Sequence, residues 1–337
     1  MHENLSRSRD LDVAKGLGIL LVVVGHGYSH STNIEVLIYG FHMPFFFIVS
    51  GMIYGQKQEQ FRFDFCKKIR TLIIPYLFFE FMWWLCIALM NVKNTDWDGT
   101  EIAIKAVFFR GNIATWYLPC LFLTELIFWM VLHTGKFKYF VIAVLYVLGV
   151  ALPGQLNESW LTILRPLVGV GFFALGYYGY KVFQIKCNGF INLGLTILYI
   201  LITIHNGLIL FYVREFHNIF LFVISSVIGT YLVLRFSANI TEMANRYNCC
   251  NILFSRLCYW GENSLAIMCI HMFVIEILRA LDYRLFNSFL PVLGESEGIF
   301  LGCVIMLCCE MIIPVLNKYF SFCIGKKKSF YGGGHQD

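Results

Sequence analysis

The chain consists of long apolar runs separated by short polar connections. A membrane-spanning helix needs roughly 20 predominantly apolar residues, and this pattern predicts an all-α, polytopic membrane bundle of about ten transmembrane helices. Several runs are short or interrupted by Gly and Pro, so nine or eleven helices also fit. The approximate spans are 13–30, 34–55, 71–91, 113–133, 137–152, 160–183, 189–208, 217–236, 257–279 and 297–320.

The overall composition supports the same class of protein. Of the 337 residues, 58% are hydrophobic and only 14% are charged, which is too little polar surface to cover a soluble globule of this size. No internal repeat, low-complexity tract or soluble domain interrupts the pattern. We therefore expect a single transmembrane domain over residues 1–330, followed by a disordered tail at 331–337.

The basic residues are unevenly divided between the two sides of the predicted bundle. If the N-terminal segment is cytoplasmic, 18 of the 26 Lys and Arg residues fall on the cytoplasmic side. Cytoplasmic loops carry such an excess, so both termini are predicted to be cytoplasmic, in a multi-pass protein of the inner (plasma) membrane. The net charge of +5 then reflects topology, and no basic patch indicates nucleic-acid binding. The 12 cysteines lack metal-ligand spacing, so no metal is predicted.

Ionisable residues inside apolar runs are costly in lipid and are therefore candidates for a functional site. Histidine is the one most easily poised to take a proton from an alcohol near neutral pH. The candidates are Lys15, His26, His30, His42, Glu80, Glu125, Arg165, His271, Glu276 and Glu310.

The first span places several of these side chains on one stripe. Lys15 and His26 are eleven residues apart, which brings them within roughly 20° of the same helix face and about 16.5 Å apart along the axis. Asp12 precedes Lys15 by three residues and His30 follows His26 by four, so all four can face one cavity along the helix. Alternatively, Asp12 and Lys15 only mark the membrane interface by snorkelling, and His26 bonds a neighbouring carbonyl.

The second span adds His42 at a depth comparable with that of His26, since it starts on the side where the first span ends. Pro44 follows, and a proline inside a span bends the helix and frees a carbonyl, as is common at cavity walls. Gly51 and Gly55 then form a G-x-x-x-G, which indicates a close helix contact.

A basic connection is expected beside Lys15. Its cations would suit the phosphates of coenzyme A if an acyl group arrives as a thioester, although the positive-inside rule alone also explains them. No G-x-S-x-G elbow, Walker A loop or H-E-x-x-H is found, so a hydrolase, ATPase or zinc mechanism has no support. The basic residues are Arg62, Lys67, Lys68 and Arg70.

The first two spans resemble a known family, the membrane acyltransferase-3 family, and more narrowly its branch of fucose 4-O-acetyltransferase-like proteins. That family's first helix carries an Arg or Lys, ten intervening residues and then a His held to be essential, which Lys15 and His26 match. The runs that carry the resemblance are Asp10-Leu11-Asp12-Val13-Ala14-Lys15-Gly16-Leu17-Gly18-Ile19, Gly25-His26 and Tyr39-Gly40-Phe41-His42-Met43-Pro44-Phe45-Phe46-Phe47-Ile48-Val49-Ser50-Gly51.

Later patches extend the resemblance. Lys67 and Arg70 correspond to the family's R-x-x-R pair, with Lys in place of the first Arg, which weakens bidentate phosphate binding at that position. The segment Thr115-Trp116-Tyr117-Leu118 is similar to a W-F/Y-L motif. The segment Glu262-Asn263-Ser264-Leu265, followed by His271, is similar to the late N-S-L pattern with its histidine.

The resemblance implies a membrane-embedded O-acyltransferase, most simply an O-acetyltransferase. It would take the acyl group from cytoplasmic acetyl-CoA, or another acyl-CoA, and pass it to a hydroxyl of a cell-surface or lipid-linked glycan. His26 would act as general base or as a transient acyl carrier, assisted by Lys15, Asp12 and His42. Lys15, Lys67 and Arg70 would hold the coenzyme. The candidates for acceptor binding are Trp116, Tyr117, Glu80, Asn263 and His271.

Two other classes remain open from the sequence. A transporter or exporter of polysaccharide or lipid-linked glycan would also use an intramembrane polar stripe, although the inverted repeats and paired broken helices of many transporters are not detected. A receptor or structural membrane protein would not need Lys15 and His26 on one stripe. Contacts with membrane lipid are expected in every case, and an oligomer is compatible with the sequence.

Overall fold

The computed structural model describes residues 9–57, 61–90, 99–109, 114–152, 160–247 and 250–326, so the predicted tail at 331–337 lies outside the described residues. The described residues are mostly helical, and the single β-bridge among them joins Leu210 to Glu215. The helices are α1 (Arg9–His26), α2 (Asn33–Tyr39), α3 (His42–Gly55), α4 (Phe65–Lys68), the π-helix η1 (Ile69–Ile73), α5 (Ile74–Met90), α6 (Thr100–Val107), α7 (Tyr117–Leu132), η2 (Gly135–Phe137), α8 (Lys138–Ala151), α9 (Leu161–Phe183), α10 (Gly189–Asn206), α11 (Ile219–Arg246), α12 (Asn251–Glu262), α13 (Ser264–Leu285), η5 (Leu290–Ser296), α14 (Glu297–Tyr319) and η6 (Ser321–Ile324).

Seven helical segments of the described chain are long and apolar enough to cross a membrane. Each corresponds to a predicted span. The other three predicted spans form α1, α7 and α8, and they differ because α7 and α8 have only 16 and 14 residues, while α1 begins with a cluster of charged side chains. The seven segments are Asn33–Gly55, Phe65–Leu89, Leu161–Phe183, Gly189–Asn206, Ile219–Arg246, Ser264–Leu285 and Leu290–Tyr319.

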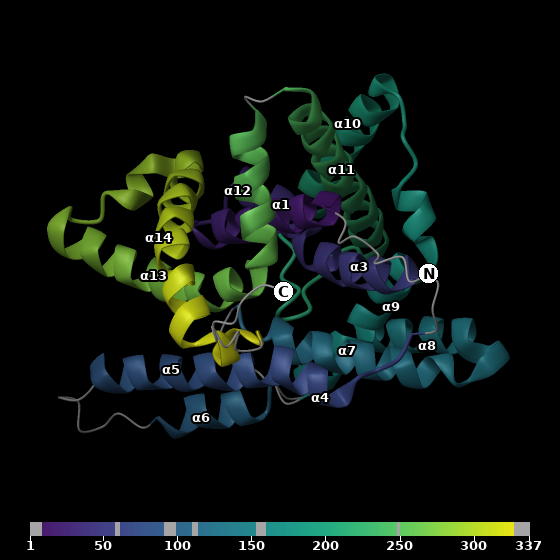
Figure 1. Ribbon diagram of the computed structural model, residues 1–337, viewed down its shortest axis with the longest axis horizontal. Coiled ribbons are helices and arrows are strands. Elements are labelled where there is room, and N and C mark those ends of the chain that lie inside the picture. The colour runs from purple at the N-terminus through teal and green to yellow at the C-terminus, as the bar shows by residue number, and fades with distance from the viewer. Residues whose placement is uncertain are drawn as a thin grey trace, which may run out of the picture.

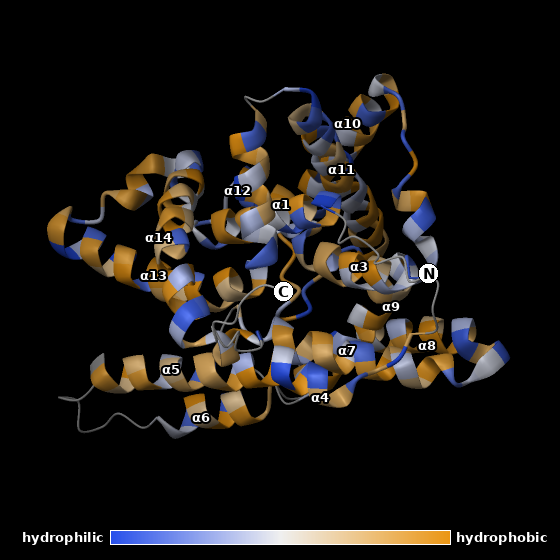
Figure 2. Ribbon diagram, viewed as in Figure 1, coloured by the Kyte–Doolittle hydropathy of each residue, from blue (hydrophilic) through white to orange (hydrophobic). Residues whose placement is uncertain are grey.

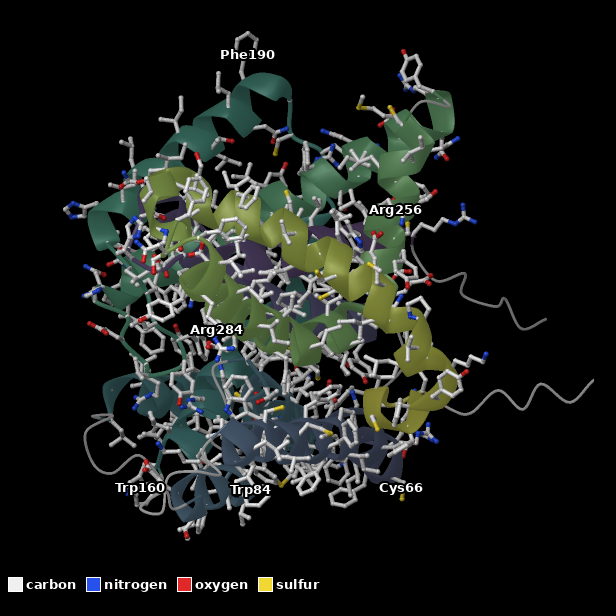
Figure 3. All side chains as sticks on the ribbon, turned by 90° about the vertical axis from the view of Figure 1, so that its left-hand side faces the viewer. Cys66, Trp84, Trp160, Phe190, Arg256 and Arg284 are labelled. Carbon is white, nitrogen blue, oxygen red and sulfur yellow. The ribbon has the colours of Figure 1, made fainter. Side chains whose placement is uncertain are left out.

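Large apolar side chains cover much of the outer surface. Phe190 is 88% exposed, and Phe220 and Met311 are each 78% exposed. Figure 2 shows apolar residues along α5, α7, α13 and α14, and Figure 3 shows Phe190 projecting away from the molecule. Such exposure would be costly in water and is expected where helices face lipid.

Helices α3 and α9 approach each other at backbone distance. A Cβ atom at Gly51 would collide with the carbonyl oxygen of Phe173, and one at Gly176 would collide with that of Ile48. Gly55 makes a similar approach to α9. Small residues permit this packing in membranes, and the close helix contact predicted from the G-x-x-x-G pattern is confirmed.

Helix α1 is enclosed by other helices. It packs against α12, α11 and α14, and its contact with α12 is again made through glycines, because Gly16 faces the Leu257 carbonyl and Gly261 faces the Asp12 carbonyl. In Figure 1, α1 lies at the centre of the view, where α12 crosses it, and α5, α6 and α7 form a separate layer below. Asp12 is therefore buried, and Lys15 and His26 are half-buried, whereas Arg9 and Asp10 at the start of α1 are exposed.

Candidate active site

A cavity of about 360 Å³ lies at the C-terminal end of α1. Its wall is formed by residues of α1, α2, α3, α13 and the loop 207–218, together with Tyr28 and with Trp116, which directly precedes α7. Sites for small molecules typically occupy roughly 300–1,000 Å³, so the cavity has room for a ligand the size of a sugar. The cavity is lined by charged and titratable side chains, which include His26, Glu35, Tyr39, His42, Glu276 and Arg279.

Two buried histidines near the cavity are held by the carbonyl one helical turn earlier. Nδ1 of His42 lies 3.1 Å from the Ile38 oxygen, and Nδ1 of His271 lies 2.9 Å from the Ile267 oxygen. A carbonyl can only accept a hydrogen bond, so Nδ1 carries the proton and Nε2 of each neutral ring is an acceptor. Nε2 of His271 is buried and has no hydrogen-bond partner among the described residues.

His26, the last residue of α1, contacts Tyr39 and His271. Its Nδ1 lies 3.1 Å from the Tyr39 hydroxyl oxygen, and its ring stacks on His271 with centroids 5.4 Å apart. Tyr39 in turn packs on the His42 ring at 4.6 Å. A tyrosine hydroxyl both donates and accepts, so when Nδ1 of His26 donates to Tyr39, Nε2 of His26 is free to take a proton.

Arg279 of α13 fixes the backbone at the end of α1. Its Nη2 donates to the Tyr28 carbonyl at 2.8 Å, with the Gly27 and His26 carbonyls at 3.4 and 3.5 Å. The last carbonyls of a helix lack intrahelical partners, and a cation there also interacts favourably with the helix dipole. Helix α13 therefore holds His26 twice, by the His271 ring and by Arg279.

The turn after α1 is tied to the start of α14. The Ser29 amide and hydroxyl donate to the buried Glu297 carboxylate at 3.1 and 2.8 Å. The Tyr28 hydroxyl donates to the Glu295 carbonyl at 3.0 Å. His30 lies in this turn, 3.5 Å from Glu297, and not on the stripe predicted with His26, because α1 ends at His26.

The loop 207–218 forms an aromatic wall of the cavity through Phe211 and Tyr212. Arg165, a buried residue of α9, donates from Nε to the Tyr212 carbonyl at 2.6 Å and packs against the Trp116 and Tyr212 rings. Arg214 donates to the Leu152 carbonyl at 2.6 Å, just after α8. Two guanidinium groups thus anchor this wall to α9 and α8.

Asp12 and Lys15 form an ion pair near the start of α1. Lys15 Nζ lies 2.7 Å from Asp12 Oδ1, and the Asp12 side chain is only 4% exposed. The pair is therefore packed against protein and is more than a pair of snorkelling side chains. The residues that line the cavity around His26 do not include Lys15, Lys67 or Arg70. Other cavities border α1 at Leu17, Leu20 and Leu21 and at Asp10 and Leu11, so the cavity around His26 does not by itself extend to Lys15.

The basic connection folds as α4 and the π-helix η1, which lead into α5. Lys67 is exposed, whereas Arg70 is half-buried, and its Nε has no hydrogen-bond partner among the described residues. Lys68 turns inward, pairs with the buried Glu125 of α7 and lies 5.1 Å from the centroid of the Tyr54 ring. Of these three cations, Lys68 is thus part of the packed interior, while Lys67 and Arg70 keep donors for an anion.

Three of the predicted acceptor-binding residues lie around the start of α7. Trp116 lines the histidine cavity. Tyr117 is buried and packs against Phe47, with ring centroids 5.0 Å apart. Glu80 of α5 is also buried and accepts a hydrogen bond from the Thr115 hydroxyl. Trp116 is therefore the member of this group that the described cavity contains.

Asn263 and His271 lie on α13 and its N-terminal cap, and the structure places them in different surroundings. His271 contacts His26, whereas Asn263 accepts a hydrogen bond from Lys326 Nζ at 2.7 Å. Gly325, next to Lys326, packs against the backbone of Arg70 and Thr71. Asn263 thus belongs with the basic residues at the other end of the bundle.

Of the six charged and titratable cavity residues named above, three were not predicted as site residues from the sequence. Tyr39 stands three residues before His42, and this spacing was the available signal. Arg279 stands eight residues, or about two helical turns, after His271, but it fell in an expected outer connection. Glu35 lies near the start of the second predicted span, where a carboxylate is ordinary.

The apolar helices and the histidine-lined cavity among them define a multi-pass membrane protein with a candidate site inside its bundle. The model of the acyltransferase-3 family, described as an acyltransferase domain, matches residues 8–313. The chain therefore belongs to the acyltransferase-3 family and is a membrane acyltransferase. No curated protein and no solved structure gives a significant match.

Proposed function

We propose that the protein is an O-acetyltransferase that moves an acetyl group from cytoplasmic acetyl-CoA to a hydroxyl of a cell-surface or lipid-linked glycan. His26 is the general base. The observation that carries the proposal is the placement of His26 in the cavity wall, with Nδ1 bonded to Tyr39 and the ring supported by His271. Histidine is well suited to deprotonate an alcohol near neutral pH.

In the proposed reaction, an ester bond forms as the thioester bond breaks, and the proton passes from the acceptor hydroxyl to coenzyme A through His26. Nε2 of His26 takes the proton of the acceptor hydroxyl while the hydroxyl oxygen attacks the thioester carbonyl carbon. The tetrahedral intermediate expels the coenzyme A thiolate, which receives the proton from His26. Tyr39 is proposed as a positioning residue that accepts a hydrogen bond from Nδ1 of His26 and so leaves Nε2 free, and His42 offers a second acceptor nitrogen in the same cavity.

The coenzyme phosphates are assigned to Lys15, Lys67 and Arg70, with Asp12 orienting Lys15. The unsatisfied Nε of Arg70 supports this assignment, since a guanidinium binds phosphate with several donors at once. Lys15 and His26 are about 16.5 Å apart along α1, so the pantetheine arm would run beside this helix. Trp116 and His271 lie near the proposed acceptor, whereas Glu80, Tyr117 and Asn263 act from outside the described cavity wall.

The proposal includes a topology. All ten apolar segments, among them α1, α7 and α8, would lie at membrane depth in one domain over residues 1–330 of an inner-membrane protein. Both termini would be cytoplasmic, which places the His26 cavity toward the outer side. The fucose 4-O-acetyltransferase-like branch is the proposed subgroup. A reporter fused after Asp337 should read cytoplasmic, and an external reading would invert the direction of donor entry.

Purified protein supplied with labelled acetyl-CoA and a glycan acceptor should form an acetylated product. His26→Ala should lower kcat at least about 100-fold, in line with the loss of a general base. Tyr39→Phe should lower kcat with little change in KM for the acceptor. His133→Ala is the control, because His133 bonds the carbonyl one turn earlier, as His42 and His271 do, but lies exposed at the end of α7 and outside the cavity.

Unchanged turnover in His26→Ala would refute the assignment of the base. Movement of the glycan across proteoliposomes without acetylation would instead favour an exporter.

A further inference from the structure

Two carboxylates line the mouth of the histidine cavity, and neither takes part in the proposed acyl-transfer step. Glu35 comes from α2 and is half-buried, and Glu276 comes from α13 and is exposed. The Glu35 carboxylate accepts a hydrogen bond from the Thr32 backbone amide at the start of α2, and the Glu276 carboxylate has no hydrogen-bond or ion-pair partner within the described part of the chain. A carboxylate can accept several hydrogen bonds, so both groups can still accept from a ligand that brings its own donors to this site for a hydroxyl.

We propose that Glu35 and Glu276 form an acceptor subsite that binds hydroxyls next to the reacting one and selects neutral sugars over sugars that carry a carboxylate or phosphate. The identity of the cavity as the acceptor site rests on the proposed function. The selection follows from the charges at the mouth.

Negative charges outnumber positive charges at the mouth. Besides the two carboxylates, the mouth holds the guanidinium of Arg279, whose Nη2 is already bonded to the Tyr28 carbonyl, with two more carbonyls close by. Two carboxylates against one guanidinium leave the mouth negative when the histidines are neutral. An anionic sugar entering it would meet like charges in a partly desolvated site, where charges interact more strongly than in water.

Neutral sugars match the same groups. An ionised carboxylate is purely an acceptor with two oxygens, and it binds a pair of neighbouring hydroxyls well. Deeper in the cavity His42 is only 5% exposed and offers Nε2 as a further acceptor. The rings of Trp116 and Tyr212 line the same cavity and suit the apolar face of a pyranose. A cavity lined by both acceptor groups and aromatic rings is one that a neutral polyol can fill.

Binding can be measured apart from turnover. Full-length protein in nanodiscs is titrated calorimetrically with a methyl galactoside and with the matching methyl galacturonide, which differ in the carboxylate. The wild-type protein should bind the galactoside at least about tenfold more tightly. Glu35→Gln and Glu276→Gln should each weaken galactoside binding about tenfold, as expected for hydrogen bonds to a charged group, and the double variant should lose the discrimination.

Glu101→Gln is the matched control, because Glu101 is a 75% exposed carboxylate on α6, away from the cavity. Equal affinity for both sugars, no binding of either, or unchanged affinities in the double variant would overturn the subsite. Acetyl transfer in the same preparation separates the two proposals. Wild-type protein that discriminates the sugars but transfers no acetyl group refutes the proposed function and retains the subsite, whereas transfer independent of both carboxylates refutes the subsite alone.

Discussion

The imidazole rings of His26 and His271 stack with centroids 5.4 Å apart and planes inclined by 30°, although they come from the first and the thirteenth α-helix. The orientation of His271 is fixed by its bond to the Ile267 carbonyl. His271 therefore acts as a rigid platform that sets the plane of the His26 ring. Such support matters because misplacing a catalytic group by about 1 Å can cost roughly 100-fold in rate.

The platform role can be separated from a role in proton transfer. His271→Ala removes the ring and should lower kcat at least about tenfold, while His271→Phe keeps a flat ring and should retain most of the activity. Steady-state rates with labelled acetyl-CoA provide the measurement. If the Phe variant is as impaired as the Ala variant, the nitrogen of His271 takes part in the chemistry.

Arg279 should matter for both stability and rate. Arg279→Met removes the donor to the Tyr28 carbonyl and should cost about 1.5–3 kcal/mol, as for a hydrogen bond from a charged group. It should also lower kcat, since the end of α1 loses its anchor. Thermal unfolding in detergent gives the first quantity. Arg284→Met on the same helix, which replaces an exposed arginine, should change stability by less than about 0.5 kcal/mol.

The pair Lys68–Glu125 should be strongly coupled. Removing one partner leaves a buried charge alone, so Lys68→Met or Glu125→Leu should each destabilise the protein by about 3–5 kcal/mol. The double variant Lys68→Met/Glu125→Leu should recover most of that loss. Unfolding by titration with a denaturing detergent would yield the coupling energy. The exposed pair Lys105–Glu101, broken by Glu101→Gln, should show less than about 1 kcal/mol.

The α3–α9 contact should not tolerate even a methyl group. Gly51→Ala places a Cβ against the Phe173 carbonyl, a backbone atom that cannot rotate away, and should cost about 1–3 kcal/mol. Gly194→Ala in α10 is the control, because its Cβ would meet open space and alanine favours a helix by up to about 1 kcal/mol. Equal losses at the two positions would contradict close packing between α3 and α9.

The helices were predictable because hydropathy reports burial in lipid directly. Seven predicted spans reappear as long apolar helices, and Gly51 and Gly55 lie at the predicted close contact. The ends of the helices were harder to predict from the sequence. A 3.6-residue period predicts His30 on the face of His26, but the period applies only while the helix continues, and α1 stops at His26.

The sequence pointed to His26 directly, but the other residues of the site were harder to predict. His26 and His42 could be placed together from their depths, since consecutive helices meet at their connection. Arg279 and Glu276 join them only through the packing of α13 on α1, a long-range contact that the local pattern does not encode. The same reason explains Asn263, which the motif grouped with His271 and the structure joins to Lys326.

Helix α13 connects the two ends of the bundle. Asn263, its N-terminal cap, is bonded to Lys326, and Arg279, about 24 Å further along the axis, holds the end of α1. A continuous helix transmits displacement along its axis with little loss. We therefore expect the spacing between the His26 and His271 rings to depend in part on the contact between Asn263 and Lys326, so that a change there alters the alignment of the proposed base.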